Sequence, residues 1–534
     1  MCRSCCFLAI VQRLPLIPRP ARPLRSACPP RGGKGSRFPL SPALIFTHIG
    51  GERRRYVSER RIGMDVVDVT LMDSWAEEEF GAAALGDARR TKRLIALADT
   101  FGRRPSASLP DAAQDPAMLK AAYRFFDTDA IEPDAILTSH CSATQDRCAS
   151  VPLVLAVQDT SELDWSQHPA TTGLGPIHTK THVGLLMHTT LALTPEAVPL
   201  GILQQYVWTR DAATFGALPD QHTRPFADKE SYRWVRGLAA VNAARDACPT
   251  TQFVMVADAE ADIYDLLVAE RRTGVELLIR AGQDRRVDHP EAARLWDALP
   301  LGTRAGTRLV HIPARDGKPG RTAELAIWFQ DITIQPPKHR AKEDLAPVTV
   351  AAVWAIEEQP PAGTDALEWL LLTSVPVDTR MQALTLLDWY CRRWGIEIWH
   401  KTLKSGCAIE SRQLETADRL RRCLAVFSVI AWRVMFSTML ARAVPDVACT
   451  AVLDDAEWQA LYCHIHRTIT LPRQPPHLHD AVGWIARLGG FQGRKGDGEP
   501  GVTVMWRGFQ HLADLTSMYR LFRRSLHNEH VGKD

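Results

Sequence analysis

The chain has 534 residues, too many for one compact domain, and 46% of them are hydrophobic, enough to fill several cores. Its net charge of +3 excludes a globally cationic surface, so contacts with nucleic acid must come from local basic patches. The 12 cysteines are scattered, which indicates reduced thiols and a cytoplasmic protein. We find no apolar run of about 18 residues and therefore expect no membrane span.

Residues 1–63 differ in composition from the rest of the chain. They contain 13 Lys and Arg against 2 Asp and Glu, are rich in proline, and show no hydrophobic periodicity. We expect a spurious or disordered extension, with Met64 as the true first residue. The alternative is a basic arm that touches nucleic acid.

Residues 64–150 have a helical pattern. Ser74 and Glu77 have the spacing of a capping box, and a second helical stretch covers residues 118–126. Four basic residues cluster in the first stretch: Arg89, Arg90, Lys92 and Arg93. Such a cluster is often only a solvated helix face. We nevertheless expect a small helical DNA-binding domain here.

Residues 151–440 alternate between strand and helix patterns. Strands are predicted at 151–157, 188–193, 198–204, 253–257 and 275–279, and helices at 229–247 and 261–272. The order is β-β-β-α-β-α-β, with the first three strands antiparallel and the later ones parallel. This is the order of a ribonuclease-H-like α/β fold. Residues 283–368, with strand patterns at 324–329 and 348–356, are predicted to be a β-rich insertion.

Helical patterns return near residue 381. One helix is predicted for residues 381–403 and another for 416–441. Residues 441–534 contain short helical segments and are predicted to be a separate helical domain. The expected architecture is therefore an α/β core with helical domains on both sides.

Two acidic residues follow predicted central strands. Asp159 ends the first strand and Asp258 the fourth, and carboxyl ends of neighbouring strands converge on the crevice where chemistry usually occurs. Buried carboxylates resist ionisation unless a cation neutralises them, and Mg²⁺ prefers carboxylate oxygens. An Asp after a strand is more often a helix N-cap, which suits Asp258 equally well.

A polar stripe marks the helix predicted for residues 381–403. Tyr390, Arg393, Glu397 and Lys404 project within an arc of about 60°, with Lys401 beside them. The stripe could be solvated, with an Arg393–Glu397 pair that contributes about 0.3–0.5 kcal/mol. The other faces carry bulky apolar residues, however, which favours a buried helix whose stripe needs a charged partner. A phosphate backbone with metal ions would be such a partner.

These residues carry a resemblance to a known family. The segment from Tyr390 to Lys404 matches the signature Y-x2-R-x3-E-x6-K of bacterial DDE transposases of the insertion-sequence-four family. Residues 157–161 and 256–264 resemble the family's two aspartate strands. Residues 84–91 resemble its DNA-binding segment, and residues 486–491 and 506–510 resemble its dimer-forming domain. The likeness covers residues 75 to 521.

The resemblance implies roles for individual residues. Asp159, Asp258 and Glu397 would hold two Mg²⁺ ions, for which Mn²⁺ can substitute. The residues implied to contact DNA are Tyr390, Arg393, Lys404, Arg280 and Trp369, the last by stacking on a flipped base. The resemblance also implies a homodimer in a synaptic complex with transposon ends. One departure is Ala259, at a position where the family usually has arginine.

The expected function is therefore cut-and-paste DNA transposition, in which transposon ends are cleaved and joined to target DNA. Two alternatives remain: a nuclease that cuts without joining, and a catalytically inactive transposase-derived DNA-binding protein or inhibitor of transposition. The presence of all three carboxylates argues against the inactive protein.

Overall fold

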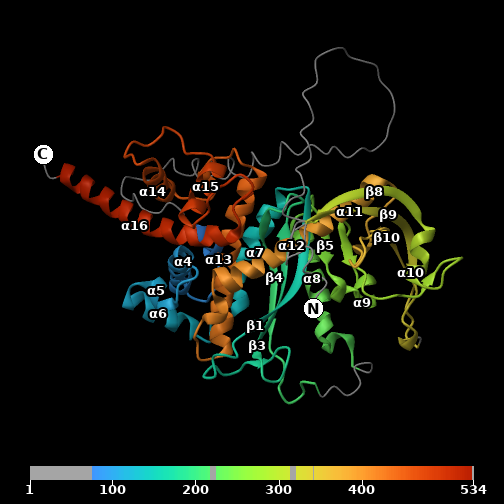
Figure 1. Ribbon diagram of the computed structural model, residues 1–534. Coiled ribbons are helices and arrows are strands. Elements are labelled where there is room, and N and C mark those ends of the chain that lie inside the picture. Colours follow the sequence, from blue (N-terminus) through green and yellow to red (C-terminus); the bar gives the residue numbers. More distant parts are fainter. Residues whose placement is uncertain (1–74, 217–223, 313–319, 341, 532–534) are drawn as a thin grey trace, which may run out of the picture.

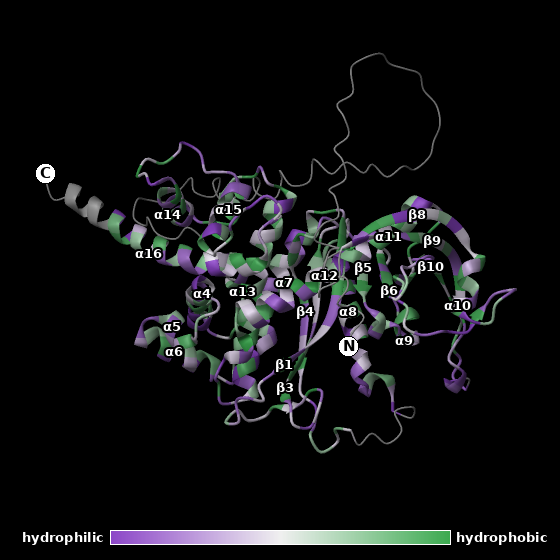
Figure 2. Cartoon of the chain, in the orientation of Figure 1, coloured by the Kyte–Doolittle hydropathy of each residue, from purple (hydrophilic) through white to green (hydrophobic). Residues whose placement is uncertain are grey.

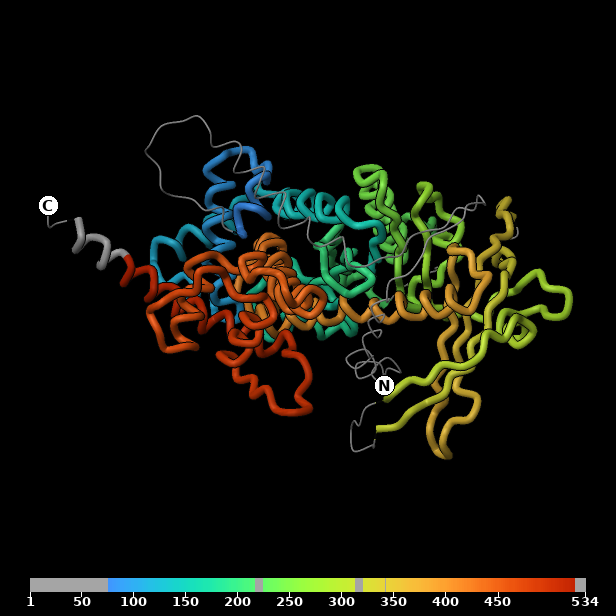
Figure 3. The backbone as a smooth tube through the Cα atoms, turned by 90° about the horizontal axis from the view of Figure 1, so that it is seen from above, coloured from blue at the N-terminus to red at the C-terminus, as the bar shows by residue number. Residues whose placement is uncertain are grey.

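The computed structural model describes residues 75–531, except for residues 217–223, 313–319 and 341. One mixed β-sheet of eleven strands runs through the described part of the chain. Helices from the two ends of the chain gather at one end of the molecule, and strands β8 to β10 form the other end (Figures 1 and 3). The architecture is therefore a large mixed sheet with helical flanks.

Five strands form the part of the sheet whose order was predicted. In spatial order they are β4 (Pro199–Trp208), β3 (Val183–Leu193), β1 (Leu153–Asp164), β5 (Gln252–Ala257) and β6 (Val275–Arg280). β1, β3 and β4 pair antiparallel, whereas β5 and β6 run parallel to β1. Helix α8 (Arg233–Ala247) connects the antiparallel to the parallel strands. The predicted strand order and directions are confirmed, and a two-residue strand, β2 (Gly175–Pro176), is added beside β3.

The predicted insertion extends the same sheet. It contributes β7 (Val287–Asp288), α10 (Leu295–Ala298), β8 (Thr303–Ile312), β9 (Arg321–Ile334) and β10 (Val348–Ile356). The next strand, β11 (Glu368–Thr373), begins at the last residue of the predicted range. β11 pairs antiparallel with β6, and β10 and β9 follow in order. The two predicted strands correspond to part of β9 and to β10. The insertion therefore continues the sheet from β6 by backbone pairing.

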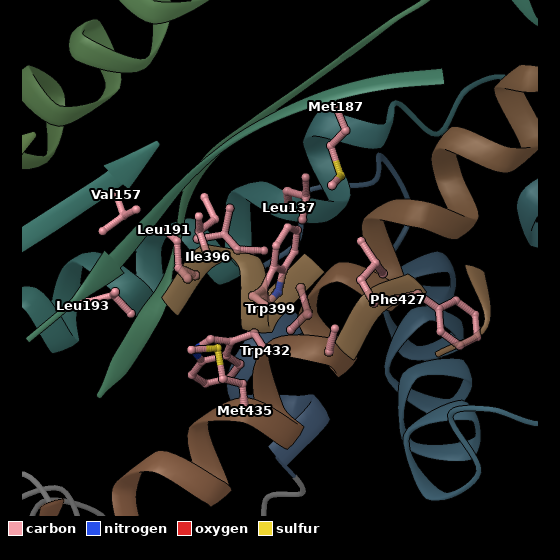
Figure 4. Packing of buried hydrophobic residues seen from close by; sticks show 14 of the residues in the cluster. Leu137, Val157, Met187, Leu191, Leu193, Ile396, Trp399, Phe427, Trp432 and Met435 are labelled. Carbon is pink, nitrogen blue, oxygen red and sulfur yellow. The ribbon is translucent and has the colours of Figure 1, made fainter. Parts of the chain in front are cut away.

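Both faces of the central strands are apolar because helices cover both. Val154 and Ala156 of β1 pack with α8, whereas Leu155 and Val157 point to the opposite face. That face is covered by α11 (Arg380–Arg392), α12 (Trp394–Lys401) and α13 (Ala417–Ala443). In Figure 4, Ile396 and Trp399 of α12 lie between the sheet residues Leu191 and Leu193 and the α13 residues Trp432 and Met435. α12 is thus held between the sheet and α13.

Helix α13 differs from the expectation that the chain has no long apolar segment. By length and composition alone it could cross a membrane. Nearly all of that stretch is buried inside the molecule, however, and Figure 2 shows the helix among the other helices of the molecule. Its hydrophobicity is therefore that of a core helix.

The described parts on either side of the sheet region are helical, as predicted. The N-terminal helices are α3 (Trp75–Phe80), α4 (Ala88–Arg103), α5 (Leu109–Ala113), α6 (Pro116–Phe126) and α7 (Pro133–Ala149), of which α5 and α7 were not predicted. The C-terminal helices are α14 (Asp455–His466), α15 (Leu478–Leu488) and α16 (Val502–Val531). Arg104 pairs with Asp514 of α16, which ties the two sets together. The predicted cap Ser74 lies outside the described residues.

One predicted helix is largely wrong. In place of a helix over 261–272, the chain forms a 3-10 turn (Ala259–Ala261) and one short helix, α9 (Tyr264–Leu267). The buried Asp262 explains the break, because its carboxylate accepts the N–H of Gly282 (2.8 Å) and pairs with Arg285 (2.6 Å). These tertiary bonds outweigh the helical propensity of the segment.

Candidate active site

The two aspartates lie beside each other on neighbouring parallel strands. The prediction that Asp159 ends its strand is wrong, because β1 continues to Asp164 in its pairing with β3, whereas Asp258 directly follows the end of β5. Val157 of β1 pairs with Val256 of β5, and Asp159 and Asp258 each follow two residues later. Neighbouring strands lie about 4.8 Å apart, so this register places the two residues side by side. Asp258 also caps the 3-10 turn after β5, because its carboxylate accepts the N–H of Glu260 at 2.9 Å. The N-cap alternative for Asp258 therefore holds together with the strand-end position.

Glu397 approaches the two aspartates from α12. The predicted single helix is divided, since α11 ends at Arg392 and α12 begins at Trp394. Arg393 lies at the junction with a nearly buried side chain, and its Nη2 is 2.6 Å from Oε1 of Glu397. The pair expected for a solvated stripe is therefore formed within a mostly buried site.

The charges of the site act on one another. Burial raises the pKa of Asp159 to about 7, with Arg393 opposing this shift and the nearby carboxylates Asp258 and Glu397 adding to it. Burial also raises the pKa of Glu397, against the effect of Arg393. Although burial opposes it, Tyr390 and Asp159 raise the pKa of Arg393. The three carboxylates and Arg393 therefore share one electrostatic environment, although they come from distant segments.

Tyr390 and Arg280 lie beside this group. Burial raises the pKa of Tyr390 to about 12, against the effects of Arg393 and Arg280, so the phenol stays protonated at neutral pH. Arg280 is at the end of β6 and donates to the carbonyl of Glu368 at 3.4 Å. Trp369 pairs with Ala355 of β10 and is only 8% exposed, so in the absence of DNA it is a core residue.

Lys404, the lysine of the motif, binds residues outside this group. Residues Thr402–Gly406 form a π-helical turn, which shifts Lys404 relative to a regular helix. Nζ of Lys404 donates to the carbonyl of Glu162 and lies 3.5 Å from the carboxylate of Glu410. Lys401 is exposed. Lys404 therefore binds β1 near its carboxyl end and does not pair with Glu397.

His400 is a neighbour of Asp159 that sequence reasoning missed. Its Nδ1 lies 3.7 Å from Oδ2 of Asp159, and burial, Lys404 and Arg393 lower its pKa to about 3. The histidine is therefore neutral at pH 7. Its position three residues after Glu397, on the same helix face, was the signal that could have identified it.

The donor set suits a divalent cation, although the carboxylates are not assembled around one. Within the described ranges, no three Asp, Glu, His or Cys side chains form a ready-made metal cluster. Carboxylate oxygens are the ligands that hard divalent ions prefer. The single charge of Arg393 leaves three carboxylates under-neutralised, as the raised pKa of Asp159 indicates. A cation entering here would favour their ionised forms.

A second basic site lies between α4 and α6. A groove of about 530 Å³ is lined by Arg89, Arg90 and Arg93 of α4 and by Lys120 and Arg124 of α6. Lys92, predicted with the first three, is exposed but does not line the groove. Lys120 and Arg124 come from the second helical stretch of the predicted DNA-binding domain, residues 118–126. Five cations on one concave surface suit a phosphate backbone.

Three segments of the chain match models of known protein families. Residues 72–131 match the transposase DNA-binding model, residues 238–431 the transposase DDE domain, and residues 429–528 the transposase Tn5 dimerisation domain. The first match contains the basic groove. The second contains Asp258 and Glu397, whereas Asp159 precedes it. The matches thus cover the basic groove, two of the three carboxylates and the C-terminal helices.

Proposed function

The chain belongs to the Tn5-like DDE transposases, and from this premise we propose that it excises and inserts DNA by two-metal phosphoryl transfer at Asp159, Asp258 and Glu397. In this proposal, strands β1, β3, β4, β5 and β6 form a ribonuclease-H-like core. The observation that carries it is the shared environment of three carboxylates, two from neighbouring parallel strands and one from α12.

Asp159, Asp258 and Glu397 would hold two Mg²⁺ ions, with Mn²⁺ as a substitute. The ions would activate the attacking water or 3′-hydroxyl and stabilise the leaving oxygen. Glu397 must first exchange the Arg393 guanidinium for this role, since the pair at 2.6 Å occupies one of its oxygens. Arg393 then becomes available for a DNA phosphate. The metal-free ion pair thus keeps both side chains neutralised until DNA and metal arrive.

The remaining predicted residues would bind the DNA end. Tyr390 and Arg280 lie beside Arg393 and would contact its phosphates, and Trp369 would stack on an extruded base. Lys401 and Lys404 would contact the phosphate backbone of the DNA where it passes the carboxyl end of β1. The groove residues Arg89, Arg90 and Arg93, with Lys92 nearby, would bind the terminal repeat.

The matched models support DNA binding and dimer formation. We place DNA binding in residues 64–150, catalysis in 151–440 and dimerisation in 441–534. The active form would be a homodimer in a synaptic complex, in which each subunit cuts the DNA end bound mainly by the other. It would act in the cytoplasm, on the DNA of a bacterial nucleoid.

The test is nicking of a labelled fragment that carries the element's own terminal repeat. Asp159→Ala, Asp258→Ala and Glu397→Ala should each lower Mg²⁺- or Mn²⁺-dependent nicking by orders of magnitude, while gel-shift binding persists. Asp246→Ala is the matched control, because this exposed carboxylate pairs only with Arg272 on α8's outer surface. If Asp258→Ala nicks at near the wild-type rate and binds normally, the carboxylate assignment is wrong. An inactive DNA-binding protein would bind the fragment and never nick it.

A further inference from the structure

We infer that Arg233 is a positioning residue that ties β1 to the turn after β5 and thereby sets the separation of Asp159 and Asp258. The inference rests on the proposed function, since it assumes that these two carboxylates act together. Arg233 begins α8, on the face of the sheet opposite α12. It therefore acts through other residues and does not itself reach the reacting atoms.

The guanidinium of Arg233 directly bridges β1 and the turn that follows β5. Its Nε donates to Oγ1 of Thr160 at 2.8 Å, and its Nη2 lies 2.8 Å from Oε2 of Glu260. Thr160 follows Asp159 in β1, and the N–H of Glu260 binds the Asp258 carboxylate at 2.9 Å. One side chain thus holds the neighbour of each aspartate, in the forked geometry that only arginine offers.

A buried chain of hydrogen bonds extends this clamp along β1. Nδ1 of His188 is 2.9 Å from Oγ1 of Thr160, and its Nε2 is 3.1 Å from Oε1 of Gln158. Since Gln158 offers an oxygen, Nε2 carries the proton in the neutral ring, and Thr160 donates to Nδ1. Thr160 then accepts from Arg233. The residues on both sides of Asp159 are therefore held, so its backbone cannot rotate independently.

Close packing of α8 places Arg233 within reach. A Cβ built on Gly237, one turn later, would lie 2.3 Å from the Gln158 side chain, so α8 approaches β1 where only glycine fits. The Arg233 side chain is only 12% exposed, while its partner Glu260 is 65% exposed. Arg233 is thus anchored in the fold, and Glu260 is the movable end that it restrains.

Loss of the clamp should weaken metal binding before it affects folding. Asp159 and Asp258 repel each other in the metal-free protein. Without Arg233, the segments of β1 and of the turn after β5 that carry them can therefore move apart. Residues that orient metal ligands typically change metal affinity or activity by 10- to 100-fold. We therefore expect Arg233→Gln and Glu260→Gln each to weaken Mn²⁺ binding about 10-fold. The double variant should be no weaker than Arg233→Gln alone.

The experiment measures Mn²⁺ binding to the full DNA-free chain by electron paramagnetic resonance, alongside Mg²⁺-titrated nicking, DNA-end affinity and thermal midpoint. Arg236→Gln is the control, because this exposed arginine lies on the same helix and stacks on Tyr206 (4.3 Å). Arg233→Gln should shift the Mn²⁺ and Mg²⁺ midpoints upward and leave DNA affinity unchanged. Arg233→Lys can bind only one of the two partners, so its Mn²⁺ and Mg²⁺ midpoints should lie between those of the wild type and those of Arg233→Gln.

Unshifted Mn²⁺ and Mg²⁺ midpoints in Arg233→Gln would overturn the inference. They would do so even if nicking falls in proportion to a lowered melting temperature, since that loss would reflect stability alone. Asp258→Ala separates this failure from that of the proposed function. If Asp258→Ala loses Mn²⁺ binding and nicking while Arg233→Gln behaves as wild type, only the positioning role is wrong. If Asp258→Ala retains both, the metal site itself is misassigned.

Discussion

Glu79 of α3 is the clearest test of how the N-terminal helices are attached to the sheet. Its carboxylate is buried and binds Nη1 of Arg147 at 2.8 Å and Nδ1 of His140 at 2.5 Å, both from α7. His140 in turn accepts the N–H of Ile202 in β4 through Nε2 at 3.1 Å. The network therefore joins α3, α7 and β4. Glu79→Gln removes its only carboxylate and leaves Arg147 buried without a counter-charge.

The expected magnitude follows from the pKa of Glu79. Burial alone would raise this pKa, but Arg147 and His140 outweigh burial and lower it from 4.5 to about 2. At 1.36 kcal/mol per unit, the shift corresponds to about 3 kcal/mol at pH 7. Truncating one partner of a buried pair independently predicts about 3–5 kcal/mol. Because the folded pKa is depressed, this stability is present above pH 4.5 and is lost as pH falls towards 2.

Hydrogen exchange of α3 and α7 peptides, followed by mass spectrometry, is the suitable assay, because a chain of several domains does not unfold in one step. At pH 7, Glu79→Gln should lower the opening free energy of α3 by about 3 kcal/mol. At pH 3 the difference from wild type should shrink to about 1 kcal/mol. Asp99→Asn, which breaks a surface pair with Arg103, should cost less than about 0.5 kcal/mol. A Glu79→Gln effect as small as that, or one that does not change between pH 7 and pH 3, would refute the reasoning.

Three further outcomes are expected. Lys120→Gln and Arg124→Gln, in the groove between α4 and α6, should each weaken DNA-end binding and lower its salt slope by about 1, measured by anisotropy from 50 to 200 mM salt; an unchanged slope would remove them from the DNA contact. Trp369→Phe keeps most of the buried volume, so the protein should fold, and on gels the steps after first-strand nicking should slow more than nicking itself; equal loss at every step would leave Trp369 a core residue. Gly237→Ala should cost about 1–3 kcal/mol and slow nicking, because its Cβ would meet Gln158; wild-type melting and nicking would show that α8 can shift away from β1.

Local patterns were sufficient to predict the order of the central strands. Runs such as 151–157 and 253–257 are apolar on both faces, which is typical of buried parallel strands, and turns separate them. The spacing of Tyr390, Arg393 and Glu397 placed all three on one helix face, and Arg393 and Glu397 do form a pair. These features depend on residues close together in the chain, so they can be read without the fold.

Other features depend on contacts between distant segments. Asp262 binds Gly282 and Arg285, and these bonds prevent the helix predicted for residues 261–272. Lys404, in the π-helical turn Thr402–Gly406, donates to the carbonyl of Glu162 on β1, a contact that the helical spacing of the motif does not report. No periodicity reports such bonds, because their partners are far apart in sequence.

The sequence by itself determined which charged residues lie on the central strands and on one face of α12. Strand and helix periods are local properties of the backbone, so they can be read from neighbouring residues. Only the tertiary structure decided how those charges are arranged. The approach of His400 to Asp159 and the bridge from Arg233 to Thr160 and Glu260 depend on how helices dock on the sheet. Docking is set by burial summed over many side chains, as at Gly237 against Gln158, and a single chain segment does not contain that information.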